Sequence, residues 1–187
     1  MIKGMIAAMI LTGLVGGGGA AVQAQDPEAG GVRRVGPANA MFSDVVWVGD
    51  VAYLSGTMAP VDVPADTAKG TPARYTTDTR AQAIAAIKAI EATLKKQGLG
   101  LGDIVQMTAF LSGDPAKNGV MDLDGWNAAY RMYFGTTEQP NKPVRATVQV
   151  ARLVSETGRI ELMVVAARPA RGPHAMPATA RVERPLR

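Results

Sequence analysis

Arg145 is the residue of this sequence best suited to bind a small acid. It lies in residues 143–153, where Val, Thr and Ala alternate in part with polar residues, as is typical of a β-strand. A guanidinium held on a strand offers a planar fork that can bind a carboxylate through two hydrogen bonds. Residues 160–165 predict a second strand, adjacent to the first, which carries Glu161. The alternative is an arginine on a solvated sheet face or in a structural ion pair.

Alternation assigns the side chains of the first strand to two faces. We expect its apolar set to face the core, because apolar residues on one side of a strand are typical of a half-covered sheet. Arg145, Thr147 and Gln149 point to one side, whereas Val144, Ala146, Val148 and Val150 point to the other.

The residue types exclude several kinds of site. The chain of 187 residues has no cysteine and one histidine, His174, which lies in a proline-rich tail. A disulfide, a thiolate metal site and a cysteine nucleophile therefore have no residues to build them. A Ser-His-Asp triad and a multi-histidine metal centre are excluded in the same way. We expect no metal.

Both ends of the chain are expected to lie outside the folded domain. Residues 1–24 resemble a signal peptide, with Lys3, an apolar run over residues 5–15 and small residues up to Ala24. That run is shorter than the ~20 residues of a spanning helix, although an uncleaved anchor is the alternative. We expect an exported, periplasmic protein without a stable membrane span after cleavage.

The segments beside the domain are rich in Gly, Pro and charge. Residues 25–38 predict a flexible lead-in and residues 168–187 a disordered Pro/Arg-rich tail. A basic tail could contact nucleic acid or an anionic membrane, but single arginines between prolines are typical of a solvated end.

The elements between these ends predict one α+β domain over residues 39–167. Two short strands are divided by the hairpin turn Gly49-Asp50, and a long loop over residues 58–76 follows them. The next helix has a capping box at Thr79 and Gln82 and a glycine stop at Gly98. The expected strands are 45–48, 51–55, 104–111, 143–153 and 160–165, and the expected helices are 78–98 and 123–134.

This order of elements predicts a single mixed sheet with two helices on one face. Two helices leave the other face solvated or buried against other subunits. The apolar content of the strands favours burial between subunits.

Several motifs, in this order along the chain, resemble the reactive intermediate deaminase (Rid, or YjgF-type) superfamily, also known as the enamine/imine deaminase or endoribonuclease L-PSP family. Each motif alone is weak, but their order and spacing are specific. They are residues 51–56, Gln82, residues 98–105, Asn127 with Tyr130, residues 143–145 and residues 150–153.

The resemblance implies a chorismate-mutase-like fold that assembles as a homotrimer, with an inner barrel of sheets and an active site at each subunit interface. Its implied reaction is hydrolysis of 2-imino or 2-enamino acids to 2-oxo acids and ammonia, without a cofactor. Arg145 would bind the substrate carboxylate, and Glu161 would act near the attacking water or the departing ammonia.

The resemblance also implies a set of substrate-binding residues. Tyr130 is expected in the core, and Gly56 could serve only as the end of its strand. Thr147 would act through its backbone amide. The implied substrate-binding set is Phe42, Ser55, Gly56, Asn127 and Thr147.

Four departures from the family pattern leave a second function open. The loop over residues 58–76 is longer than the family norm, and the tail after Ala167 is additional. Met163 replaces a second acidic residue, and the signal peptide moves the protein away from cytosolic sources of imino acids. The alternative is a non-catalytic trimer that binds small carboxylates or a protein partner. The chain offers neither a histidine pair nor a clustered basic-aromatic surface for ribonuclease activity, so we expect no nucleic-acid partner.

Overall fold

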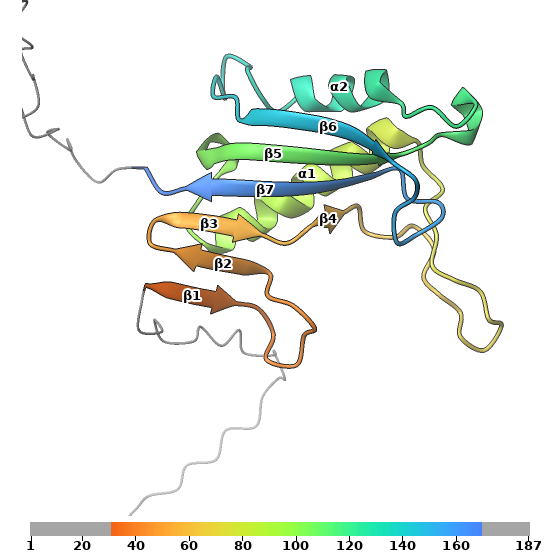
Figure 1. The fold of residues 1–187 in the computed structure, drawn as a ribbon, viewed down its shortest axis with the longest axis horizontal. Helices are drawn as coiled ribbons and strands as arrows, with labels where there is room; N and C mark the ends of the chain where they lie inside the picture. The colour runs from red at the N-terminus through yellow and green to blue at the C-terminus, as the bar shows by residue number, and fades with distance from the viewer. Residues whose placement is uncertain (1–30, 170–187) are drawn as a thin grey trace, which may run out of the picture.

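Seven strands form a single mixed sheet in the computed structural model, which describes residues 31–169. The order across the sheet is β1-β2-β3-β7-β5-β6, with β4 also paired to β7 (Figure 1). Only β5 and β6 run parallel. The strands are β1 (Val32–Val35), β2 (Val45–Val48), β3 (Val51–Leu54), β4 (Thr57–Met58), β5 (Ile104–Ser112), β6 (Val144–Val150) and β7 (Ile160–Ala167).

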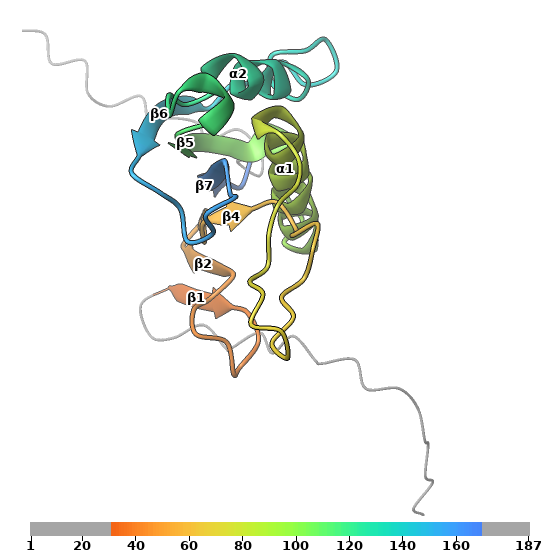
Figure 2. The same ribbon diagram turned by 90° about the vertical axis from the view of Figure 1, so that its right-hand side faces the viewer.

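Helices α1 (Thr79–Lys96) and α2 (Leu123–Arg131) pack on one face of this sheet (Figure 2). The expected α+β architecture is therefore confirmed. The expected neighbour relation of the last two strands is wrong, because β5 lies between β6 and β7. Two single-turn 3-10 helices, Leu101–Asp103 and Pro115–Lys117, lie at the two ends of β5.

The lead-in predicted to be flexible contains a strand. β1 pairs antiparallel with β2, and Val35 is buried opposite Val45. The composition of this segment does not predict the strand, because two of its four residues, Arg33 and Arg34, are charged. At the other end, the Arg168 amide donates to the Asp50 carbonyl at 2.9 Å. The predicted signal peptide and residues 170–187 of the predicted tail lie outside the described residues. No helix within residues 31–169 is long and apolar enough to cross a membrane.

The ends of α1 are closed by specific hydrogen bonds. Asp78, and not Thr79, caps the first turn, because its carboxylate accepts from the Ala81 amide at 2.8 Å. Gly98 ends the helix as predicted, with a left-handed φ of 73°. The following Leu99 amide reaches back to the Leu94 carbonyl at 3.0 Å, which completes a Schellman closure.

Gln82 joins the start of α1 to the β6–β7 loop. Its amide nitrogen donates to the carbonyls of Thr77 and Thr157 at 2.8 and 3.2 Å. Its carbonyl oxygen accepts from the Arg159 amide at 2.8 Å. The side chain is 1% exposed, so these bonds satisfy polar groups that water cannot reach.

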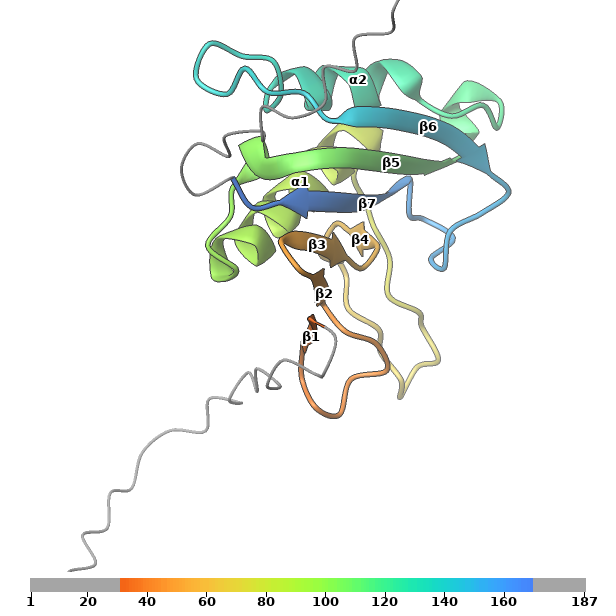
Figure 3. The same ribbon diagram turned by 60° about the vertical axis from the view of Figure 1, so that its left-hand side comes forward.

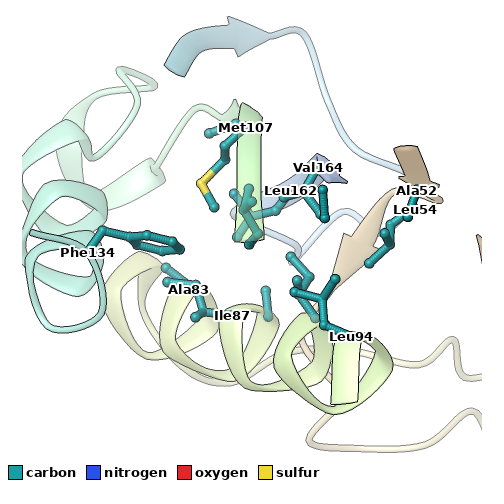
Figure 4. Close-up of a cluster of buried hydrophobic side chains, with 14 of the residues drawn as sticks. Ala52, Leu54, Ala83, Ile87, Leu94, Met107, Phe134, Leu162 and Val164 are labelled. Atoms are coloured by element: carbon teal, nitrogen blue, oxygen red, sulfur yellow. The ribbon is translucent and has the colours of Figure 1, made fainter. Parts of the chain in front are cut away.

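The core lies between the helices and the covered face of the sheet (Figure 4). Side chains of α1 such as Ile87 and Leu94 meet Leu162 and Val164 of β7 there. Each fully buried side chain of this size contributes roughly 1.5–3 kcal/mol. Trp126 of α2 is also completely buried.

Neither α1 nor α2 covers the opposite face of the sheet (Figure 3), and exposed apolar side chains lie on that face. Val144 is 70% exposed, and Tyr53, Val148 and Met163 are exposed as well. The apolar set of β6 therefore does not face the core, and that prediction is wrong. Alternation divides a strand into two faces, but it does not tell which face the helices cover when the open face is also apolar.

The long loop between β4 and α1 is held by hydrogen bonds. Two isolated bridges, Val63 with Arg74 and Asp66 with Thr71, pair its two arms. Asp62 accepts from the Thr76 amide at 2.6 Å, and hydrogen bonds from Thr76 and Thr77 lower the pKa of its carboxyl.

Candidate functional site

The polar side chains of β6 contact α2 and the loop before it. Arg145, Thr147 and Gln149 alternate along the strand, and each binds α2 or the loop that precedes it. The indole Nε1 of Trp126 donates to Thr147 Oγ1 at 3.1 Å. Gln149 donates to the Gly119 carbonyl at 2.8 Å. The side chains that alternation placed together therefore lie on the helix side of the sheet.

Arg145 is fixed by three side chains of α2. Its Nη2 donates to Asn127 Oδ1 at 2.9 Å, and its Cζ lies 4.5 Å from the centre of the Tyr130 ring and 5.5 Å from that of Trp126. A cation over an aromatic ring gains about 0.5–2 kcal/mol, which limits the number of orientations of the guanidinium. Among residues 31–169, no carboxylate lies within ion-pair distance of Arg145. The guanidinium is held without being neutralised, which disfavours the structural ion pair.

An open pocket of about 410 Å³ lies beside this arginine. Tyr130 and Phe134 stack with their ring centres 4.7 Å apart on one of its walls. Burial raises the pKa of the Tyr130 phenol, against an opposing effect of Arg145, so the phenol is protonated at neutral pH. The lining residues are Asn127, Tyr130, Arg131, Phe134, Gly135, Lys142, Pro143 and Arg145.

Glu161 lies on the other face of the sheet. The register pairs Arg145 with Met107 and Met107 with Val164, both of which are buried under the helices. Phe110, three residues further along β5, pairs with Glu161. Directly paired residues share a face and successive residues alternate, so Arg145 and Glu161 point to opposite faces. One chain alone does not bring them together.

Glu161 has its own group of neighbours. It pairs with Met58 across β4, and a Cβ at Gly56 would overlap its carboxylate. The close approach therefore requires a glycine at position 56. Ser55 Oγ donates to the Ser43 carbonyl at 2.6 Å, which ties the end of β3 to the β1–β2 loop.

Phe42 is carried by this β1–β2 loop. Its side chain is 65% exposed and lines a small pocket together with residues 34–38 of the same segment. Because β1 and β6 are the two edges of the sheet, the loop that carries Phe42 lies far from Arg145 (Figure 1).

The candidate residues thus form two groups. We call Arg145, Asn127 and Thr147 the arginine half-site, at the β6 edge. We call Glu161, Gly56, Ser55 and Phe42 the glutamate half-site, around β3, β7 and the β1–β2 loop. Each half-site carries one of the two groups that the resemblance assigns to chemistry.

Tyr130 and Trp126 contribute to the arginine half-site, although the sequence places Tyr130 in the core. Trp126, Tyr130 and Phe134 recur at a spacing of four, and the first two rings meet edge to face at 5.6 Å. That spacing indicates a stacked row on one helix face. The spacing does not indicate that this row of rings also contacts Arg145 on β6. Among the described residues, no group of three or more His, Cys, Asp or Glu side chains is placed to hold a metal ion.

A family model described as Endoribonuclease L-PSP matches residues 34–168. A RutC family protein of Haemophilus influenzae is 31% identical over 127 residues, which is 68% of this chain and 86% of that protein. A 2-iminobutanoate/2-iminopropanoate deaminase of Salmonella typhimurium is 32% identical over 121 residues, which is 65% of this chain and 82% of that protein.

Solved structures share the same fold. The YjgF gene product of Escherichia coli is 28% identical with a TM-score of 0.52, over 71% of this chain and 91% of that one. TdcF of Escherichia coli, solved with bound serine, is 25% identical with a TM-score of 0.52, over 78% of this chain and 98% of that one.

Proposed function

Because this chain belongs to the endoribonuclease L-PSP family of YjgF and Rid proteins, we propose that it hydrolyses reactive 2-imino or 2-enamino acids to 2-oxo acids and ammonia. The observation that carries this proposal is the fixed and unneutralised guanidinium of Arg145 beside an open pocket. The names of the deaminase from Salmonella typhimurium and of TdcF with bound serine support a small substrate that carries a carboxylate.

Arg145 would bind the substrate carboxylate through two parallel hydrogen bonds. Asn127 accepts from Nη2, and Cζ of Arg145 lies over the Tyr130 ring, so these contacts orient the guanidinium before the substrate arrives. A carboxylate held in this way places the neighbouring C=N carbon at a defined position, which lowers the entropic cost of attack by water.

Glu161 would transfer the protons of the reaction. Water adds to the C=N carbon and gives a proton to the carboxylate, which returns it to the nitrogen. This gives a carbinolamine, whose hydroxyl proton the same carboxylate then passes to the amino group. The C–N bond breaks as the C=O bond forms, and ammonia leaves. Gly56 leaves the space that the Glu161 carboxylate occupies for these transfers.

A second copy of the chain would complete the site, since the two half-sites lie on opposite faces of one sheet. The open apolar face of the sheet, with Tyr53, Val148 and Met163, is the surface that such copies would bury. We propose a homotrimer in which the arginine half-site of one chain meets the glutamate half-site of the next.

Arg145→Ala tests the proposal. Loss of one bidentate charge-assisted contact should lower turnover of an imine of alanine by about 30- to 1000-fold. The imine is made in situ by an amino-acid oxidase, and ammonia or 2-oxo acid release is measured. Arg80→Ala is the control, because Arg80 is an exposed arginine of α1 that does not line the pocket, and its side chain donates to the Met132 sulfur. Unchanged turnover in a correctly assembled Arg145→Ala protein would reject the role of this residue.

The non-catalytic alternative predicts a different result in the same experiment. If 2-oxo acids stabilise the wild-type protein against heat and no imine is turned over, the cleft only binds small carboxylates.

A further inference from the structure

The pocket beside Arg145 carries more positive charge than one carboxylate needs. Arg131 from the end of α2 and Lys142 from the loop before β6 line it together with Arg145, and none of its eight lining residues is Asp or Glu. Within residues 31–169, neither Arg131 nor Lys142 takes part in an ion pair. Three cations therefore line one concave surface that has no Asp or Glu among its lining residues.

Lys142 is placed by the backbone next to it. Gly135 has a left-handed φ of 72°, and a Cβ at this residue would overlap Cε of Lys142. The lysine stem therefore lies against the glycine, and Nζ stays 3.4 Å from the position of that absent Cβ. This contact places the lysine stem and its ammonium at the wall of the pocket.

The three cations differ in how firmly they are held. Arg145 is fixed by its neighbours, whereas Arg131 and Lys142 lie at the rim of the pocket. Arg145 is hydrogen-bonded to Asn127 and its Cζ lies over the Tyr130 ring, so these two contacts set its position. Arg131 follows Tyr130 directly and is exposed at the end of the helix. Like charges that face one cavity repel each other, and an anion bound between them removes that repulsion.

We propose that the site prefers dianionic substrates, namely 2-imino acids whose side chain ends in a second carboxylate. This inference rests on the proposed function. The first carboxylate binds Arg145, and the second lies between Lys142 and Arg131. A pocket of about 410 Å³ has room for a diacid of about five carbons.

Binding of two product-like acids tests the preference without any need for turnover. The affinities of the full assembled chain for 2-oxoglutarate and for 2-oxobutanoate are measured by titration calorimetry at constant ionic strength. We expect the wild type to bind the dianion at least about ten-fold more tightly, because each rim cation contributes about five-fold at close range in a water-like medium. Lys142→Met and Arg131→Gln should each lower the ratio of the two affinities about five-fold.

Lys88→Met is the matched control. It removes the same charge from an exposed position of α1 outside the pocket, so the ratio should not change. The preference for dianions is wrong if the wild type binds both acids alike, if it binds neither, or if the ratio is the same in all four proteins.

A second measurement separates this inference from the proposed function. Turnover is compared for imines made in situ from glutamate and from 2-aminobutanoate. If both imines are hydrolysed equally fast and Arg145→Ala abolishes both reactions, the proposed function holds and the preference fails. If the affinity ratio behaves as expected and neither imine is hydrolysed, the preference holds and the deaminase proposal fails.

Discussion

Gly56 controls the position of the Glu161 carboxylate. A methyl group at residue 56 would overlap that carboxylate, so Gly56→Ala must displace it from the glutamate half-site. We expect imine turnover to fall about 10- to 100-fold, the range typical for a misplaced proton-transfer group. The affinity for 2-oxo acids should fall less, since the proposed carboxylate contact is made by Arg145 and not by Glu161. Steady-state kinetics and titration calorimetry measure the two effects.

Gly100→Ala is the control for this substitution. Gly100 has a φ of -132°, which any residue adopts, and an added Cβ there meets no atom within 4 Å. The control should keep wild-type turnover. Wild-type turnover in Gly56→Ala would show that the position of Glu161 does not matter for the reaction.

The sequence identifies a candidate site residue where a charged side chain occurs within a predicted strand. Arg145 is a charged residue in a β-rich run, and motifs at both ends of the domain support its role. Its partners Asn127 and Tyr130 lie on a helix 18 and 15 residues earlier in the chain. Their contact with Arg145 depends on how α2 crosses β6, and no local pattern contains that information.

The ends of helices and strands can be predicted from the sequence where a single residue type, such as glycine, determines the local backbone. The hairpin turn at Gly49 and the helix stop at Gly98 both have a left-handed backbone, which glycine adopts without strain. Alternation assigns the wrong buried face to β6, because its polar face packs on α2 while its apolar face is open in the single chain. Only the position of the helix layer decides between them.

The stability of the loop between β4 and α1 should depend on pH, because the carboxylate of Asp62 holds this loop. Hydrogen bonds from Thr76 lower the pKa of its carboxyl in the folded state, so the ionised form stabilises the loop. That stabilisation is present above the ordinary aspartate pKa of about 3.9 and is lost as the pH falls through the folded value. Asp62→Asn should therefore be less stable than the wild type at pH 6, and the difference should shrink from pH 5 to pH 3.

Thermal unfolding of both proteins over this range measures the difference. Asp62 is exposed, so only the pH dependence of the difference between the two proteins is predicted. A gap in melting temperature that stays constant between pH 6 and pH 3 would mean that the charge of Asp62 has no role in holding the loop.

The sheet separates Arg145 and Glu161, the two residues that the proposed reaction needs in one site. The arginine half-site lies at the β6 edge and the glutamate half-site around β3 and β7, on opposite faces. The order of strands could not be derived from local patterns, since β7 inserts between β3 and β5 from the end of the chain. The sequence therefore indicated the two residues but placed them on neighbouring strands of one chain.

Subunit mixing tests whether the half-sites meet between chains. Arg145→Ala and Glu161→Gln are each expected to be inactive as pure oligomers, because every site then lacks one group. When equal amounts are unfolded and reassembled together, about a quarter of the interfaces in a cyclic oligomer combine an intact arginine half-site with an intact glutamate half-site. We therefore expect about a quarter of the wild-type activity to return. Arg145→Ala mixed with Arg145→Leu should restore none, because both variants damage the same half-site. If verified mixed oligomers of the first pair also stay inactive, Arg145 and Glu161 do not act in one site shared between two chains.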